Sequence, residues 1–191
     1  IIVFQQEIRR FLLLIGTSNI LNKSKYFFWK FQLRNLYYID IQSVVKAISK
    51  MSSTRTGALI VITKKNTLEH ISDTGVILEA KMSDQLLESI FYKNNPLHDG
   101  AVIILNNKIY AAKCVLPITK ATDFPEKYGL RHRAAVGITE QSDAVVIVVS
   151  EQTGQFAYCK DGIVMQNVSL DRLILFLEQE FNTPAIANKK V

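Results

Sequence analysis

Apolar residues recur at helical spacing in three parts of the chain, and each series follows a polar residue suited to cap a helix. The capping candidates are Asp40, Ser83 and Ser169. The apolar series that follow them are Ile41, Val44, Val45, Ile48 and Met51; Leu86, Leu87, Ile90 and Phe91; and Leu170, Leu173, Ile174 and Leu177. Each series predicts an amphipathic helix, because its members fall on one helical face. A further helix is predicted to begin near Arg131, after Gly129.

Short continuous apolar runs predict strands. Residues 57–63 (GALIVIT) and 144–149 (AVVIVV) are rich in β-branched side chains, which favours buried strands over helices. A β-hairpin is predicted from segments 101–105 and 108–116, because Asn106-Asn107 between them tolerates positive φ.

A second hairpin is predicted from segments 155–159 and 163–166, which flank Lys160-Asp161-Gly162. Helices therefore alternate with strands at both ends of the chain, whereas hairpins occupy the middle. This order predicts an α/β fold in which a central mixed β-sheet carries helices on both faces, rather than a purely parallel doubly wound sheet.

The N-terminal part of the chain differs from the rest. Residues 1–15 predict a helix that ends at Gly16, and the aromatic and basic stretch 20–39 carries no clear pattern. We therefore expect residues 1–39 to form an N-terminal helix with a connecting segment. Residues 40–184 are expected to form the main domain, and residues 185–191 a C-terminal tail.

The composition excludes several classes of protein. At 48% hydrophobic and 21% charged residues, the chain has the make-up of a globular protein rather than a disordered one. Cys114 and Cys159 lie in apolar, strand-like segments and are interpreted as buried thiols. The three histidines lack metal-ligand spacing, which excludes a standard zinc site.

The net charge of +6 is concentrated at one end of the chain. Residues 1–40 hold six Lys and Arg against two acids, whereas the later residues hold seventeen against fifteen. A basic N-terminal segment is typical of a membrane-proximal position, and an ordinary solvated segment would explain it equally well. A nucleic-acid-binding surface is disfavoured, because charge is nearly balanced over the predicted main domain. No apolar run approaches the roughly 18–20 residues that a spanning helix needs.

The generic phosphate-binding motifs, the P-loop and G-x-G-x-x-G, are absent from the sequence, so a nucleotide site must use another design. One candidate is Asp99-Gly100, which precedes the predicted strand at 101–105. Asp99 is thereby placed at a strand end, where active sites of open sheets collect, and Gly100 allows close approach of a ligand. Taken alone, the pair is better explained as a simple turn.

Two other segments place polar side chains beside predicted elements. Arg131 and Arg133 lie at a predicted helix start, where guanidiniums and free backbone N–H groups suit phosphate, although a surface basic cluster explains them equally well. Ser150 and Glu151 follow the strand at 144–149 and could bind phosphate and metal. An ordinary polar turn is the stronger explanation for that pair alone.

Taken together and in order, these segments resemble the diadenylate cyclase (DAC) family. The resemblance rests on residues 55–61 (RTGALIV), 96–102 (PLHDGAV), 116–117 (LP), 129–135 (GLRHRAA) and 149–151 (VSE). Residues 2–16 further resemble the stretch that follows the last transmembrane helix in the membrane-anchored CdaA subgroup. This favours the membrane-proximal interpretation of the basic end.

The resemblance implies roles for particular residues. Asp99 is expected to be the catalytic acid tied to the 3′-hydroxyl or the metal, and the catalytic set is Asp99, Arg131, His132 and Arg133. The residues expected to contact ATP are Gly57, Gly100, Ala101, Leu116, Leu130, Arg131, Arg133, Ser150 and Glu151. The residues expected to hold a divalent Mg or Mn ion are His98, Asp99 and Glu151.

The sequence departs from the family pattern at two positions. Leu130 stands where many members have Thr, so a hydroxyl contact to phosphate is lost while the backbone N–H remains. Gln152 stands where many members have a second Glu. If that position binds metal, the change alters the affinity or the preference for the metal.

The activity implied is condensation of two ATP molecules into cyclic di-AMP with release of two pyrophosphates. Because the product is symmetric and one domain holds one ATP, a homodimer with C2 symmetry is expected. A membrane anchor is expected to precede residue 1 and to place the domain at the cytoplasmic face of the cell membrane. The alternatives are a catalytically weak regulatory module that binds ATP or a cyclic dinucleotide, and a nucleic-acid-binding protein.

Overall fold

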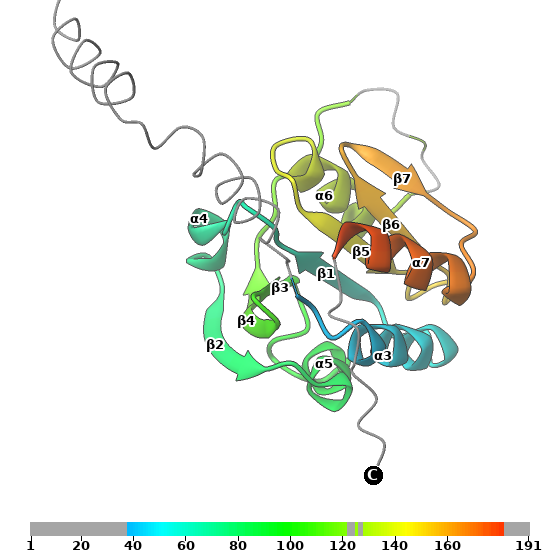
Figure 1. Cartoon of the computed structure of the whole chain (residues 1–191), viewed down its shortest axis with the longest axis horizontal. Coiled ribbons are helices and arrows are strands. Elements are labelled where there is room, and N and C mark those ends of the chain that lie inside the picture. The colour runs from blue at the N-terminus through cyan, green and yellow to red at the C-terminus, as the bar shows by residue number, and fades with distance from the viewer. Residues whose placement is uncertain (1–37, 122–124, 126–127, 182–191) are drawn as a thin grey trace, which may run out of the picture. The chain divides into compact units, whose positions relative to one another are not determined.

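A seven-stranded sheet forms the centre of the part of the chain that the structure, a computed structural model, describes: residues 38–121, 125 and 128–181 (Figure 1). Its strand order is β2-β4-β3-β1-β5-β6-β7. β1 pairs in parallel with β3, and the remaining neighbours pair antiparallel. The sheet is therefore mixed, as the order of elements in the sequence predicts.

The elements have the following bounds. The strands are β1 (Ala58–Ile62), β2 (Val76–Lys81), β3 (Ala101–Leu105), β4 (Lys108–Cys114), β5 (Val145–Val149), β6 (Phe156–Lys160) and β7 (Ile163–Met165). The helices are α3 (Ile41–Ser53), α4 (Glu69–Ser72), α5 (Asp84–Phe91), α6 (Leu130–Thr139) and α7 (Leu170–Glu180). The four helices predicted between Asp40 and Leu177 and both predicted hairpins are thereby confirmed to within two residues.

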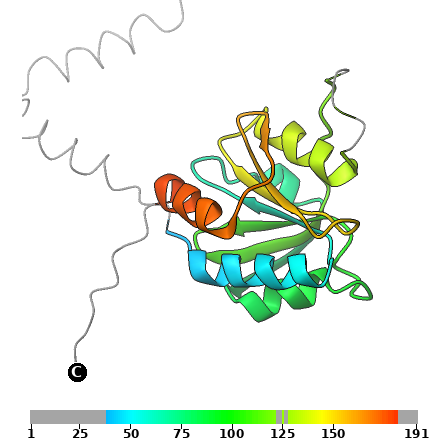
Figure 2. The same ribbon diagram turned by 90° about the vertical axis from the view of Figure 1, so that its right-hand side faces the viewer.

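Helices cover both faces of the sheet (Figure 2). The core on one face includes residues of α3, α5 and α7, and that on the other includes residues of α4 and α6. β1 serves both, since Ile60 and Ile62 belong to the first core and Leu59 and Val61 to the second. Successive side chains of a strand point to opposite faces, so a fully apolar run is what a strand between two helix layers requires.

The three predicted caps are present. The side chain of Asp40 accepts a hydrogen bond from the Ser43 N–H at 3.1 Å. Ser83 and Ser169 accept in the same way from the backbone N–H three residues later, at 3.4 and 3.3 Å. Each bond satisfies one of the N–H groups that the first turn of a helix leaves without an intrahelical partner.

Sequence reasoning missed two elements, β2 and α4. β2 is an edge strand whose pairing with β4 shifts register between Ile77 and Ala80, where Glu79 has φ of 49°. The bulge interrupts the alternation of apolar and polar positions that would have revealed a strand. α4 is a single turn of four residues, too short to display a helical period.

The helix predicted over residues 1–15 and the tail predicted over residues 185–191 lie outside the described residues. The domain boundaries therefore stay predictions. Among the helices of the described ranges, none combines the length and the apolar character that crossing a membrane requires.

Candidate functional site

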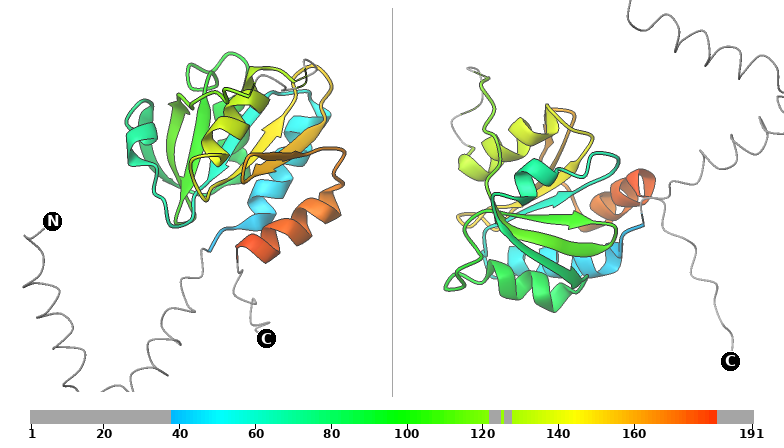
Figure 3. Two further views of the ribbon diagram at one scale, coloured as in Figure 1. Left: turned by 90° about the horizontal axis from the view of Figure 1, so that it is seen from above. Right: turned by 90° about the vertical axis from the view of Figure 1, so that its left-hand side faces the viewer.

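A cleft opens at the edge of the sheet where β1 and β3 begin and where β4 and β5 end. The register brings these ends together, because Ala58 pairs with Val149 and Ala101 pairs with Cys114. α6 packs on one face of the sheet, whereas α3 and α7 pack on the other (Figure 3). One parallel and two antiparallel pairings thus gather segments distant in sequence at a single edge.

The cleft has a volume of about 760 Å³. Its lining residues are Leu59, Asp99, Gly100, Cys114, Val115, Leu116, Ile118, Gly129, Leu130, Arg131, His132, Ala134, Val148, Val149, Ser150, Glu151 and Gln152. Ligand pockets occupy about 300–1,000 Å³ and combine an apolar lining with a few convergent polar groups. Size and lining both fit a nucleotide.

Eight of the residues predicted for the site line this cleft: Asp99, Gly100, Leu116, Leu130, Arg131, His132, Ser150 and Glu151. The structure therefore brings together the acid before β3, the start of α6 and the turn after β5. Gly57, His98, Ala101 and Arg133 are not among the lining residues.

Gly100 sets the backbone path that brings Asp99 to the cleft. Its φ is +143°, and a Cβ added there would lie 2.7 Å from the backbone carbonyl carbon of Lys113 on β4. Only glycine accommodates both the positive φ and this close packing. The exposed carboxylate of Asp99 is thereby held at the mouth of β3, two residues before the buried first residue of the strand.

Asn95, which sequence reasoning missed, organises the loop between α5 and Asp99. Its side-chain amide donates to the Ser89 carbonyl at 2.8 Å, and its side-chain oxygen accepts from the Leu97 N–H at 2.9 Å. Its backbone carbonyl accepts from Nδ1 of His98 at 2.6 Å. Because a carbonyl only accepts, Nδ1 carries the proton, and Nε2 of the neutral ring keeps its lone pair. The Asn-Pro pair was the available sequence signal.

Arg131 and Glu151 form an ion pair across the cleft, with Nη1 and Oε2 separated by 2.7 Å. The hydrogen bond from Arg131 and its positive charge hold the pKa of Glu151 below its ordinary value. A Cβ at Gly57 would lie 2.6 Å from Nη1, so the guanidinium occupies the space that a side chain there would fill. Gly57 therefore serves the site through Arg131.

α6 separates the two arginines that the sequence places two residues apart. Positions i and i+2 lie about 200° apart around a helix, so they do not share a face. Arg131 lines the cleft, whereas Arg133 does not. The intervening His132 also lines the cleft, and its partial burial lowers the pKa of its imidazole. At pH 7 the neutral form of His132 is favoured, so it offers hydrogen bonding more than charge.

The turn after β5 is held by local hydrogen bonds. The Ser150 hydroxyl oxygen accepts from the Thr153 N–H at 3.3 Å, which leaves the hydroxyl proton able to donate. Ser52 Oγ of α3 donates to the Gly154 carbonyl at 2.6 Å, which anchors the end of the turn. This turn presents Ser150, Glu151 and Gln152 to the cleft.

Apolar side chains form a rim, of which sequence reasoning singled out Leu130 but missed Val115 and Ile118. Val115, Ile118 and Leu130 line the cleft and are 67%, 51% and 73% exposed. Leu116, between the first two, is buried. An apolar surface beside a charged one matches the two ends of a nucleotide, a flat base and a polyphosphate.

The predicted metal ligands divide between the cleft and its border. Asp99 and Glu151 line the cleft, and His98 lies in the adjoining loop. Within the described ranges, no three His, Cys, Asp or Glu side chains lie close enough to enclose a metal ion. Carboxylate oxygens suit Mg²⁺ or Mn²⁺, and Mg²⁺ characteristically binds through one or two carboxylates together with substrate phosphates.

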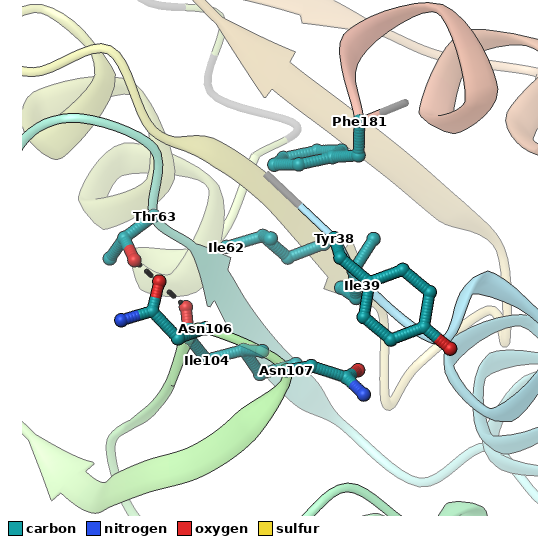
Figure 4. Close-up of a pocket in the computed structure, with 8 residues that line it drawn as sticks. All are labelled: Tyr38, Ile39, Ile62, Thr63, Ile104, Asn106, Asn107 and Phe181. Carbon is teal, nitrogen blue, oxygen red and sulfur yellow. Dashed lines mark hydrogen bonds between the residues drawn. The ribbon is translucent and has the colours of Figure 1, made fainter. Parts of the chain in front are cut away.

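A second cavity lies near the opposite edge of the sheet, between β1, β3, the Asn106-Asn107 turn and Phe181 (Figure 4). Its volume is about 10 Å³, which is room for one water molecule. The hydroxyl of Thr63 donates across it to the Ile104 carbonyl at 3.0 Å. The cavity is too small for a nucleotide.

Comparison with known proteins points to one family. Residues 45–164 match the DAC family, described as the nucleotide-binding domain of the DisA bacterial checkpoint controller. The chain is 40% identical over 181 residues to the cyclic di-AMP synthase CdaA of Bacillus subtilis, an alignment that covers 95% of this chain and 64% of CdaA. It thus spans less than two thirds of the length of this relative.

Two solved structures have a similar fold. DacA of Staphylococcus aureus, crystallised as a double cysteine mutant, matches with a TM-score of 0.72 at 41% identity over 74% of this chain and 94% of that one. A hypothetical membrane-spanning protein of Bacillus cereus matches with a TM-score of 0.66 at 37% identity over 86% and 87% of the two chains. The predicted α/β fold is confirmed.

Proposed function

The chain belongs to the DAC family of nucleotide-binding domains, and from this membership we propose that it is a diadenylate cyclase. It joins two ATP molecules into cyclic di-AMP. In each of two equivalent steps, the 3′-oxygen of one ATP forms a bond to the α-phosphorus of the other, and the bond to pyrophosphate breaks. The 3′-hydroxyl proton leaves as each phosphodiester forms.

The observation that carries the proposal is the single cleft in which Asp99 and Arg131 meet. Phosphoryl transfer asks a protein mainly for positioning and for stabilisation of charge. Asp99 would accept the proton of the attacking hydroxyl, and Arg131 would offset charge on the phosphates. Ser150 and the N–H groups at the start of α6 add hydrogen bonds to phosphate oxygens.

The base is proposed to lie against the apolar rim of Val115, Ile118 and Leu130, with the backbone near Leu116 at its edge. This orientation directs the triphosphate toward Arg131 and Glu151. Arg133 and Ala101 do not line the cleft, so they would act on the nucleotide only indirectly, through the residues that do. Ala101 is fully buried in β3 and contributes packing and backbone only.

A divalent cation, Mg²⁺ or Mn²⁺, is proposed as cofactor. Asp99 and Glu151, with His98 beside them, would hold it together with phosphate oxygens. When bound, such an ion neutralises charge on the triphosphate and assists departure of pyrophosphate. Asp99 and Arg131 would position the nucleotide to which the ion is bound.

Membrane association is proposed from two features. The B. cereus relative is named as a membrane-spanning protein, and residues 1–40 carry six basic residues against two acids. Lys and Arg beside a bilayer are attracted to anionic headgroups. A membrane anchor before residue 1 would then hold the domain at the cytoplasmic face.

Incubation of the protein with ATP and Mg²⁺ or Mn²⁺, followed by mass analysis of the products, tests the proposal. We expect cyclic di-AMP and pyrophosphate in a ratio of one to two. Tight binding of ATP or cyclic di-AMP without any product would instead favour the regulatory module. ATP hydrolysis to ADP alone would contradict a diadenylate cyclase.

Arg131→Ala is expected to weaken ATP binding about ten- to 150-fold, the loss of one charge-assisted hydrogen bond. Adenosine binding should change little, since the guanidinium lies at the phosphate end of the cleft. Arg172→Ala is the matched control, because Arg172 is an exposed arginine on α7. Calorimetric titration that shows equal losses for ATP and adenosine would contradict the role.

A further inference from the structure

Three elements converge on the ion pair between Arg131 and Glu151. Arg131 is the second residue of α6, Glu151 follows β5, and Gly57 precedes β1. The side chain of Arg131 is 27% exposed, whereas that of Glu151 is 61% exposed. The arginine is therefore held against the sheet, and the carboxylate reaches it from the solvent side.

Both groups of the ion pair lie beside Gly57. Nη1 of Arg131 lies 2.6 Å and Oε2 of Glu151 lies 3.0 Å from where a Cβ at this glycine would be. Glu151, by contrast, belongs to a turn whose hydrogen bonds involve Ser150, Thr153 and Gly154 rather than its own side chain. Because the Glu151 side chain is the more exposed of the two, it is the partner better able to leave the pair.

Glu151 also lies within a field of positive charge. Besides Arg131, Lys93 and His98 from the α5–β3 loop act on its carboxylate. When the carboxylate turns away, Arg131 lines the cleft without a compensating charge. An incoming polyphosphate would restore the balance.

We propose that Glu151 is a placeholder for a phosphate group. In the nucleotide-free domain it occupies the Nη1 donor of Arg131 and keeps the guanidinium oriented. When ATP binds, a phosphate oxygen takes its place as acceptor, and the released carboxylate turns away from Arg131. The inference rests on the proposed function, in which Arg131 contacts the phosphates of ATP.

If Glu151 is a placeholder, replacing it should increase the affinity for ATP. In EDTA, where no divalent ion can recruit Glu151, Glu151→Gln removes the charge that competes with phosphate for Arg131. ATP affinity should rise roughly two- to fivefold, the size expected for a partly exposed ion pair. A merely structural role predicts the opposite sign, because a disturbed cleft binds ATP more weakly.

Two controls separate the placeholder from a general effect of charge. Glu178→Gln makes the same change at an exposed position on α7 and should leave ATP affinity unchanged. In an Arg131→Ala background, Glu151→Gln should give no gain, because the donor for which it competes is absent. Adenosine affinity should not change in any of these variants.

Equilibrium dialysis of ATP in EDTA measures each of these affinities. A rise with Glu151→Gln that disappears without Arg131 supports the placeholder. An unchanged or weaker affinity overturns it, and so does a gain that persists without Arg131. If the parent protein binds ATP and makes cyclic di-AMP but the expected affinity changes are not found, only the placeholder is contradicted and the proposed function is kept. If the parent protein binds no ATP in EDTA, the placeholder is contradicted, and if it also makes no cyclic di-AMP with Mg²⁺ or Mn²⁺, the proposed function is contradicted as well.

Discussion

Asp99→Asn is expected to lower the rate of cyclic di-AMP formation about 10²–10⁴-fold, the range for loss of one general base or one electrostatic group. The carboxylate lies at the mouth of β3 and lines the cleft that Arg131 also lines. Asparagine has the same shape but neither the charge nor the basicity needed to accept the 3′-hydroxyl proton.

The fold should survive this substitution. Asp99 is exposed, and Gly100 rather than the Asp99 side chain sets the path of the loop. Asp171→Asn on α7 is the matched control, because Asp171 is an exposed aspartate in the first turn of a helix on the opposite face. Near-normal turnover by a folded Asp99→Asn protein, with thermal unfolding like that of the parent, would show that the acid is not Asp99.

Specific activity is expected to fall about tenfold for each tenfold dilution once the protein is mostly monomeric, because the dimer population then depends on the square of concentration. Each domain offers one cleft for one ATP, whereas the product contains two equivalent phosphodiester bonds. A face-to-face dimer with C2 symmetry presents each bound nucleotide to the other. The exposed Val115, Ile118 and Leu130 lie around the cleft mouth that such a dimer would cover.

A dilution series tests this, with the fraction of dimer measured in parallel by sedimentation. Constant specific activity down to concentrations at which the protein is monomeric would exclude the two-protomer reaction. Mixing the parent with excess Asp99→Asn protein provides a second measurement. Mixed dimers complete at most one of the two bonds, so activity should fall and a linear intermediate with a 5′-triphosphate should accumulate.

Arg131 and Arg133 differ in position although they belong to one motif. The sequence places Arg131 and Arg133 in one short motif, and both are plausible phosphate ligands there. Helical geometry then points them in different directions, and only Arg131 lines the cleft. The sequence therefore identifies the motif, whereas the orientation of the helix on the sheet selects the residue within it.

The sequence by itself determined the features that depend on near neighbours. The caps at Asp40, Ser83 and Ser169, the two apolar runs and the two hairpins follow from spacing and turn chemistry within a few residues. The mixed sheet with helices on both faces follows from the order of these elements. The family resemblance assigned the candidate acid, Asp99, for the same reason, because the motif that contains it is contiguous.

Only the tertiary structure decided the features that join distant segments. The bulge in β2 arises from its pairing with β4, and the bond between Arg131 and Glu151 arises because α6 and the end of β5 reach the same edge. The space beside Gly57 is filled by a guanidinium more than seventy residues away in the chain. Local pattern carries no information on such contacts, since their partners are specified by how the elements pack and not by spacing along the chain.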